Sequence, residues 1–413
     1  MQTVVLHPGT QHSRQTALAL QELDRLAFLF TGLFDHPLSV PHRFADKLPA
    51  FLQTRLKREL GRFASPALDP ARVRAMPRYE LPERLATRAG FPDLGRSIDA
   101  VLNKAFGKRA ARLAEAEGPF VLWGYDNSAF AAFADPRTRD CPKVLDRTIG
   151  DGRYWNEEIE RIAATHGDWL VGGTPRWREE RIARNDIEYA HADRIVCGSP
   201  FVADSVARYS PVEGLREKLV LLPYSFDRTL FAGAPEPQPV PPGEPVRFLF
   251  AGQVSARKGI QHLLEAIARL PSGAARLSVV GPVMVPPHML APFADRVDFL
   301  GPVPRSDMPA IMRRHHALVF PSHFEGSALV LIEAMASGLA IIQSAAAGLG
   351  ASARSGIVLD RPDAALLEQA MSGLLQDRET LHAMRLAAME ESQERDFDAY
   401  RGRIAALLGQ MGV

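Results

Sequence analysis

The sequence predicts an α/β protein with two doubly wound domains, each built on a parallel sheet. Short apolar runs alternate with longer helical patterns along most of the chain, as they do in such sheets. A proline-rich segment divides these patterns into two halves. The chain has 413 residues, which is more than one hydrophobic core normally serves, so two domains of roughly 150 to 250 residues are expected.

The boundary between the halves follows from the chemistry of proline. Six prolines lie between positions 232 and 245, and each removes a backbone donor and fixes φ, so no regular element can continue through them. We therefore expect a first domain over residues 1–232, a linker over 233–245 and a second domain over 246–390. A further helical pattern covers residues 396–411.

The expected strands are short apolar runs bounded by turn residues. Those of the first domain are residues 3–7, 119–123, 143–146, 194–197 and 219–222. Those of the second domain are residues 246–251, 277–281, 297–300, 317–320, 340–343 and 356–358.

Composition narrows the function classes. The formal net charge is +1, so the chain lacks the basic field typical of nucleic-acid binding. No apolar stretch has the length that spans a bilayer, and residues 1–7 have the pattern of a strand rather than a signal peptide, so a cytoplasmic protein is expected. Cys141 and Cys197 have neither disulfide nor metal-site spacing and are expected to be inert thiols.

Two glutamates eight positions apart give the strongest functional signal. Glu325 lies in a glycine-bearing turn after an apolar strand, and Glu333 lies inside an apolar helix that we expect to begin near Gly326. The first amides of that helix would face the carboxyl end of the strand, where α/β sheets bind phosphorylated ligands. An ionised Glu333 among apolar neighbours needs a hydrogen-bonding partner, and a ribose diol would serve.

This strand, turn and helix resemble the E-x7-E signature of the retaining glycosyltransferases of family 4. These proteins have the GT-B fold, in which two Rossmann-like domains face a central cleft. Residues 246–260 resemble the family's diphosphate-binding loop, with Lys258 in the position of its usual lysine. Further similar segments follow the family's order, at residues 192–199, 221–231, 277–282 and 297–303.

The resemblance implies transfer of a sugar from a nucleoside diphosphate to a hydroxyl acceptor, with retention of configuration. The sugar nucleotide would be a co-substrate, and no cofactor is expected. Lys258, Arg257 and helix amides would stabilise the departing diphosphate, Glu325 would hold the transferred sugar, and Glu333 would hold the ribose. The other implied donor-binding residues are Gly252, Gln253, Gly281, Val303, Gly326, Ser327, Ala328 and Leu329. The final helix, 396–411, is expected to pack back on the first domain.

Two departures from the family pattern bear on the mechanism. Gln253 stands where many members have an arginine, and we expect Arg257 to supply the missing charge, because guanidinium binds phosphate oxygens in a bidentate way. Many members also carry a histidine near the reacting sugar, but the comparable loop, residues 143–152, has none. Asp146, Arg147 or Thr148 is then expected to take over that contact.

Two segments of the first domain can each be interpreted as functional or as purely structural. Gly9, Thr10 and His12 follow the first strand, and they either contact phosphate or acceptor in the cleft or belong to a helix cap. Residues 41–64 interleave basic and apolar side chains. This pattern is typical of helices on anionic membrane surfaces, which would place the protein at the inner face of a membrane, and also of ordinary domain helices.

The sequence also bears on functions other than the transferase. No metal is expected at the donor site, because Asp396-Phe397-Asp398, the only Asp-x-Asp, begins the final helix and suits capping. A nicotinamide oxidoreductase is disfavoured, since no Gly-x-Gly-x-x-Gly follows a strand. A silent sugar-nucleotide-binding protein and a GT-B epimerase or phosphorylase remain alternatives. For a transferase, the expected acceptor is a glycan or lipid-linked hydroxyl, in cell-surface polysaccharide or glycolipid assembly.

Overall fold

The structure is a computed structural model of the chain. It describes residues 1–9, 12–37, 43, 49, 53, 57, 60, 61, 63–79, 82, 86, 90–231 and 233–413. Thr10 and most of residues 41–64 therefore lie outside the described residues, and their predicted contacts stay predictions. Among the described residues, no helix is long and apolar enough to cross a membrane.

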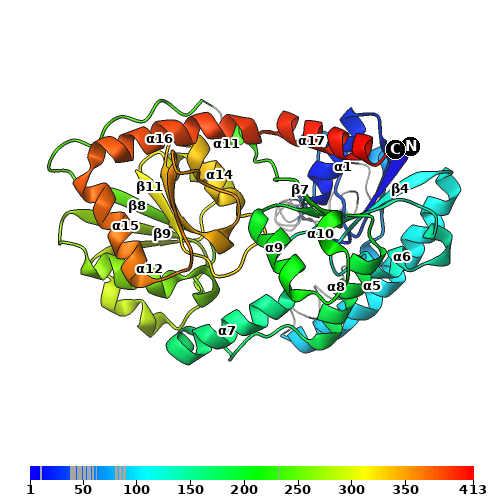
Figure 1. Ribbon diagram of the computed structural model, residues 1–413, viewed down its shortest axis with the longest axis horizontal. Helices are drawn as coiled ribbons and strands as arrows, with labels where there is room; N and C mark the ends of the chain where they lie inside the picture. Colours follow the sequence, from blue (N-terminus) through cyan, green and yellow to red (C-terminus); the bar gives the residue numbers. More distant parts are fainter. Residues whose placement is uncertain are drawn as a thin grey trace.

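The first domain is built on a parallel sheet of seven strands in the order β3-β2-β1-β4-β5-β6-β7 (Figure 1). The strands are β1 (Gln2–Leu6), β2 (Leu26–Thr31), β3 (Val73–Ala75), β4 (Phe120–Tyr125), β5 (Lys143–Arg147), β6 (Arg194–Cys197) and β7 (Leu219–Leu221). The helices among its described residues are α1 (Ser13–Glu22), α5 (Pro92–Ala114), α6 (Phe130–Phe133), α7 (Gly152–His166), α8 (Glu179–His191), α9 (Pro200–Tyr209), α10 (Leu215–Lys218) and α11 (Arg228–Phe231).

The second domain is built on a parallel sheet of six strands in the order β10-β9-β8-β11-β12-β13. The strands are β8 (Val246–Ala251), β9 (Ala275–Val280), β10 (Val297–Gly301), β11 (Ala317–Phe320), β12 (Ala340–Ser344) and β13 (Gly356–Leu359). Its helices are α12 (Ile260–Arg269), α13 (Met308–Met312), α14 (Leu329–Ala336), α15 (Ala364–Gln376) and α16 (Arg378–Ser392), and α17 (Phe397–Gln410) ends the chain.

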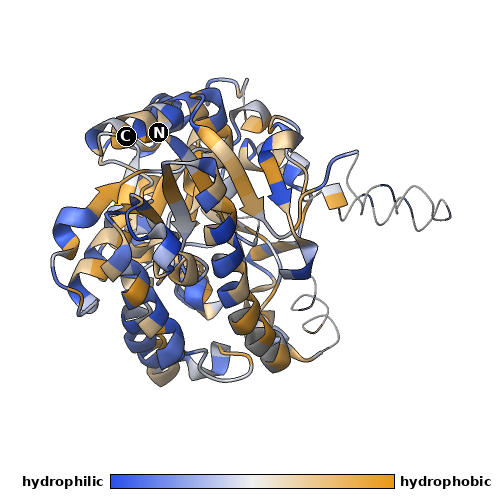
Figure 2. Cartoon of the chain, turned by 90° about the vertical axis from the view of Figure 1, so that its right-hand side faces the viewer, coloured by the Kyte–Doolittle hydropathy of each residue, from blue (hydrophilic) through white to orange (hydrophobic). Residues whose placement is uncertain are grey.

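The prediction of two doubly wound parallel sheets is confirmed. Two strands of the first sheet, β2 and β3, were not predicted. β2 follows α1 after a turn in which Asp24 adopts a left-handed φ of 54°, so its apolar residues continue the apolar pattern of the helix without a glycine or proline between them. The apolar strands lie inside and the more hydrophilic helices outside, as the hydropathy colours show (Figure 2).

Two helices pack against the domain opposite to the one suggested by their position in the chain. Trp155, Ile159 and Ile162 of α7 belong to the hydrophobic cluster that fills the second domain. Tyr400 and Ile404 of α17 belong to a cluster on the first sheet, where α17 lies against α1 (Figure 1). The two domains are therefore connected by buried apolar surface as well as by the linker.

Candidate active site

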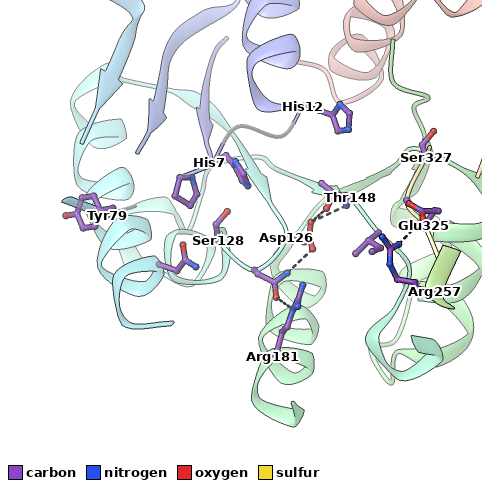
Figure 3. Close-up of a pocket in the computed structure, with 16 residues that line it drawn as sticks. His7, His12, Tyr79, Asp126, Ser128, Thr148, Arg181, Arg257, Glu325 and Ser327 are labelled. Atoms are coloured by element: carbon purple, nitrogen blue, oxygen red, sulfur yellow. Dashed lines mark hydrogen bonds and ion pairs between the residues drawn. The ribbon is translucent and has the colours of Figure 1, made fainter. Parts of the chain in front are cut away.

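The candidate site lies where the strand order of each sheet reverses. In the first sheet the reversal is between β1 and β4, and in the second it is between β8 and β11. Loops that leave the carboxyl ends of such strand pairs form the usual ligand crevice of a doubly wound sheet. A cavity of about 570 Å³ is lined by the loops after β1, β4 and β5 and by residues of the loops after β8 and β11 (Figure 3).

Glu325 is the centre of the second domain's contribution. Its Oε1 lies 2.6 Å from Lys258 Nζ and 2.8 Å from Arg257 Nη1, and it accepts a hydrogen bond from Ser322 Oγ at 2.8 Å. Burial lowers the pKa of Lys258, and the carboxylate of Glu325 opposes that shift. The cluster holds two cations and one carboxylate, so it keeps a positive charge with which to bind an anion.

Glycines let the loops of the two domains approach closely. A Cβ on Gly326 would lie 1.7 Å from the carbonyl oxygen of Thr148, across the boundary between the domains. The carbonyl oxygen of Gly326 accepts a hydrogen bond from Ser199 Oγ at 2.5 Å, and Gly150 N donates to Glu325 O at 3.4 Å. The predicted loop around Gly326 is thus held directly against the first domain.

The second domain also holds Glu333 and the remaining donor-site candidates. Glu333 Oε1 is 2.7 Å from Nη2 of Arg305, and burial raises the pKa of Glu333 while Arg305 opposes the shift. A smaller cavity of about 280 Å³ is lined by residues of the strand ends and of the following loops, including Gly252, Gln253, Gly281 and Val303. A Cβ on Gly281, which has a φ of 137°, would lie 1.9 Å from the carbonyl oxygen of Gly252.

Two serine hydroxyls near the predicted donor site have no protein partner among the described residues. Ser327 Oγ and Ser255 Oγ are buried and without a hydrogen bond. Ser327 lines the large cavity, and Ser255 lies in the loop that carries Arg257 and Lys258. Buried hydroxyls are normally satisfied, so these two are available to a ligand. Ala328 and Leu329 follow Ser327 in the chain, as the N-cap and the first residue of α14.

Asp126, at the end of β4, organises the first domain's side of the cavity. Its Oδ1 accepts from Thr148 Oγ1 at 2.6 Å and from Thr148 N at 3.2 Å, and its Oδ2 accepts from Arg147 Nη1 at 3.1 Å. The loop continues through Asn127, which has a φ of 66° and whose Oδ1 accepts from Arg181 Nε at 3.2 Å (Figure 3).

Some of the predicted first-domain site residues line the cavity, and others are buried away from it. Thr148, Gly9 and His12 line the cavity, with His12 stacked 3.6 Å from the ring centroid of Tyr224. Arg147 is fully buried behind the cavity, where it also donates to Gly150 O at 2.6 Å. Asp146 is fully buried too, accepts from Tyr224 Oη at 2.6 Å, and has its pKa raised to about 7 by burial.

Several cavity residues were not anticipated from sequence. They are His7, Tyr79, Asn103, Asp126, Asn127, Ser128 and Arg181, together with Arg305 beside Glu333. The run Asp126-Asn127-Ser128 directly after an apolar strand was a usable signal, because polar residues at strand ends are candidates for ligand contact. Burial lowers the pKa of His7 to about 4, so its imidazole is neutral at physiological pH.

The second domain is similar to a known protein family. Residues 245–377 match the family model described as Glycosyl transferases group 1. The chain is similar to this family over that range. A similar protein is the D-inositol 3-phosphate glycosyltransferase of Salinispora arenicola, which is 31% identical over 257 residues, covering 58% of this chain and 52% of the relative. The Nocardia farcinica protein of the same name is 28% identical over 222 residues, covering 48% and 49% of the two chains.

The chain thus spans about half the length of the curated relatives it matches. Solved structures are similar over the whole chain. Sucrose-phosphate synthase from Thermosynechococcus elongatus has a TM-score of 0.66 at 18% identity, covering 100% of this chain and 99% of that one. The Anabaena protein HepE in complex with UDP has a TM-score of 0.62 at 14% identity, covering 99% and 100%. These similarities confirm the predicted GT-B fold.

Proposed function

We propose that the protein is a retaining glycosyltransferase that moves a sugar from a nucleoside diphosphate to a hydroxyl acceptor. The observation that carries the proposal is the cluster of Lys258, Arg257 and Glu325 at the edge of a cavity between the domains. The match of residues 245–377 to the glycosyltransferase family supports it, and the buried carboxylate of Glu333, paired with Arg305, supports it further.

The donor is proposed to rearrange the ion pairs that surround these carboxylates. Its diphosphate takes over Lys258 and Arg257, so that Glu325 is released to accept hydrogen bonds from hydroxyls of the transferred sugar. Arg305, whose side chain is 57% exposed, turns away from Glu333, which then accepts from the ribose. The base occupies the smaller cavity near Gly281 and Val303.

The proposed chemistry needs no protein nucleophile. As the glycosidic bond to phosphate breaks, negative charge grows on the leaving diphosphate, and Lys258 and Arg257 stabilise that charge more strongly than they stabilise the ground state. The acceptor hydroxyl approaches from the first-domain side of the cavity, past Thr148 and Asp126. Thr148 is the cavity-lining member of the three residues proposed to replace the family's histidine.

A panel of sugar nucleotides tests the proposal. UDP-, GDP-, ADP- and CMP-sugars would be compared by thermal shift and by donor hydrolysis, starting with UDP-glucose because HepE was solved with UDP-glucose. Saturation at a hundredfold over Kd should stabilise the protein by about 2.7 kcal/mol. We expect one donor class to stabilise and to be hydrolysed, with both effects lost in Lys258→Ala and Glu333→Ala and kept in Lys108→Ala, which alters an exposed lysine of α5.

The alternatives give different results in the same assay. Stabilisation without hydrolysis, even with acceptors, would favour a silent binding protein, and no response to any nucleotide would refute the proposal. Turnover with phosphate or water alone would favour a phosphorylase or epimerase. D-inositol 3-phosphate is the first free acceptor to test, because the similar proteins are named for it. Lipid-linked glycans follow, and residues 41–64 remain the proposed site of membrane contact.

A further inference from the structure

A group of two histidines and one glutamate lies away from the cavity, between α7 and α12. His166 is the last residue of α7, and His262 and Glu265 lie one helical turn apart on α12. Their candidate ligand atoms all lie within 4.8 Å of one another. None of the three lines the large cavity or the smaller one.

The hydrogen bonds of His166 show why this arrangement is unusual. Thr165 Oγ1 donates its only proton to the carbonyl oxygen of Arg161 at 3.0 Å, so its contact with His166 Nδ1 at 2.9 Å requires that Nδ1 be the donor. In a neutral imidazole, Nε2 then carries a lone pair. That atom lies 3.4 Å from Glu265 Oε1, so two acceptors lie close to each other.

A cation between the two atoms resolves this conflict, and either a proton or a metal ion can provide it. A protonated imidazole normally approaches a carboxylate to about 2.7 to 2.9 Å, which is closer than the observed separation. A tetrahedral zinc ion, with bonds of about 2.0 to 2.2 Å, holds its ligand atoms about 3.3 to 3.6 Å apart. The distance of 3.4 Å between Nε2 and Oε1 matches the second case.

His262 adds a third donor with suitable chemistry. Its ring lies 4.8 Å from that of His166 in an edge-on arrangement. Its side chain is partly buried, and an imidazole nitrogen is the commonest metal ligand in proteins. Glu265 directs Oε2 toward Arg269 at 3.9 Å, which leaves Oε1 on the side of the histidines.

We propose that His166, His262 and Glu265 form a site for a divalent transition metal, with zinc as the best match. Two imidazole nitrogens and one carboxylate oxygen are a donor set that zinc accepts in tetrahedral geometry, with water in the fourth position. Magnesium and calcium prefer oxygen ligands and should not replace it. Thr165 orients the His166 ring through Nδ1, as second partners of metal-binding histidines commonly do.

The site would tie together two helices that both begin at the candidate active site. α7 begins at Gly152, shortly after Thr148, and α12 begins at Ile260, directly after the loop that carries Lys258. α7 packs its apolar face into the second domain's core. A metal between the last residue of α7 and the first two turns of α12 would fix the relative position of the two helices, and with it the spacing of the loops that precede them.

Metal uptake by the purified full chain tests the proposal. After treatment with a chelator, the protein is dialysed against zinc, and bound metal is counted by atomic emission and followed by thermal shift. We expect one zinc per chain and a higher Tm, with affinity at least about tenfold weaker in His166→Gln and in Glu265→Gln. Both side chains are partly exposed, so these variants should fold.

His288→Gln is the matched control, because His288 is an exposed histidine outside the group. It should bind zinc as the wild type does. Failure of the wild type to take up zinc would overturn the proposal. Equal zinc affinity in the wild type and in both ligand variants would overturn it as well. Neither result depends on sugar-nucleotide binding, so the test stands apart from the proposed transferase activity.

Discussion

Lys258 is the side chain on which the proposed chemistry depends most directly. Its ammonium contacts Glu325 at 2.6 Å and lies 4.7 Å from the centroid of the Phe320 ring, so it is held in a mostly buried position. Lys258→Met keeps the stem of the side chain and removes the charge. We expect sugar transfer or donor hydrolysis to fall about 10²- to 10³-fold, which is the usual cost of removing one group that stabilises transition-state charge.

Stability should change far less than activity in Lys258→Met, because Glu325 keeps its contacts with Arg257 and Ser322. Steady-state kinetics and a urea unfolding curve measure the two effects separately. Lys108→Met, at an exposed position of α5, is the control and should retain full activity. Equal activity in the wild type and Lys258→Met would contradict the assigned role.

The ionisation of Glu333 should make donor affinity depend on pH. Burial raises the pKa of Glu333, and the ionised form is the one that accepts hydrogen bonds from both ribose hydroxyls. Donor affinity should therefore be highest above this pKa and should weaken as pH falls through it. A UDP-sugar suits the measurement by calorimetry, because its diphosphate does not titrate in the same range.

Two variants sharpen the pH test. Glu333→Gln should bind the donor more weakly at neutral pH and should lose the pH dependence. In the free protein Arg305 holds the pKa of Glu333 down, so Arg305→Ala should move the midpoint of the pH profile upward. A wild-type profile that stays flat across the acidic range would rule out Glu333 as the titrating ribose ligand.

At the scale of elements, the contact between the Gly326 loop and the first domain sets the geometry of the site. A Cβ at position 326 would lie 1.7 Å from the carbonyl oxygen of Thr148, so Gly326→Ala must push the two loops apart. Because positioning errors of about 1 Å can cost about 100-fold in rate, we expect a loss of that order in kcat/KM. Gly373→Ala, an exposed position inside α15 with open space around it, should instead stabilise the protein by up to about 1 kcal/mol.

A small effect of Gly326→Ala on activity would show that the loops do not need to touch during catalysis. Measuring the Tm of both variants separates this effect from unfolding. Gly326→Ala should keep a cooperative transition, since the clash lies in loops rather than in the cores of the sheets.

The second domain's half of the site could be predicted because it is local in sequence. Lys258 and Glu325 each lie in a strand, loop and helix whose pattern fixes which end of the strand they follow. The first domain's half could not be predicted in the same way. Asp126 and Arg181 come from β4 and α8, and only the tertiary packing brings them to one cavity. Sequence also gave no means to separate Thr148, which lines the cavity, from Arg147, which is buried behind it.

At the scale of the whole molecule, alternation of strands and helices was sufficient to predict two parallel sheets. It was insufficient for β2, whose apolar residues follow α1 without a proline or glycine between them. The alternation also did not predict where α7 packs. Its Trp155, Ile159 and Ile162 lie in the core of the second domain, although α7 precedes the linker in the chain. Packing between distant segments, rather than local pattern, decides such placements.

The last helix contributes to the stability of the first domain. Ile404 of α17 is fully buried in the cluster that also contains Trp123 of β4, and Tyr400 Oη lies 2.8 Å from Thr16 Oγ1 of α1. Ile404→Ala should lower the free energy of unfolding by about 2 to 5 kcal/mol, because it leaves a cavity between α17 and the first sheet. The exposed Gln410→Ala on the same helix should change it by less than about 0.5 kcal/mol.

Urea unfolding followed by tryptophan fluorescence measures this difference, since Trp123 lies in the affected cluster. If Ile404→Ala and Gln410→Ala unfolded at the same urea concentration, α17 would not be part of the folded first domain in solution. If the large loss is found, the segment before the linker cannot reach its full stability alone. The first domain is then completed only when the last helix, which follows the entire second domain in the chain, packs against α1.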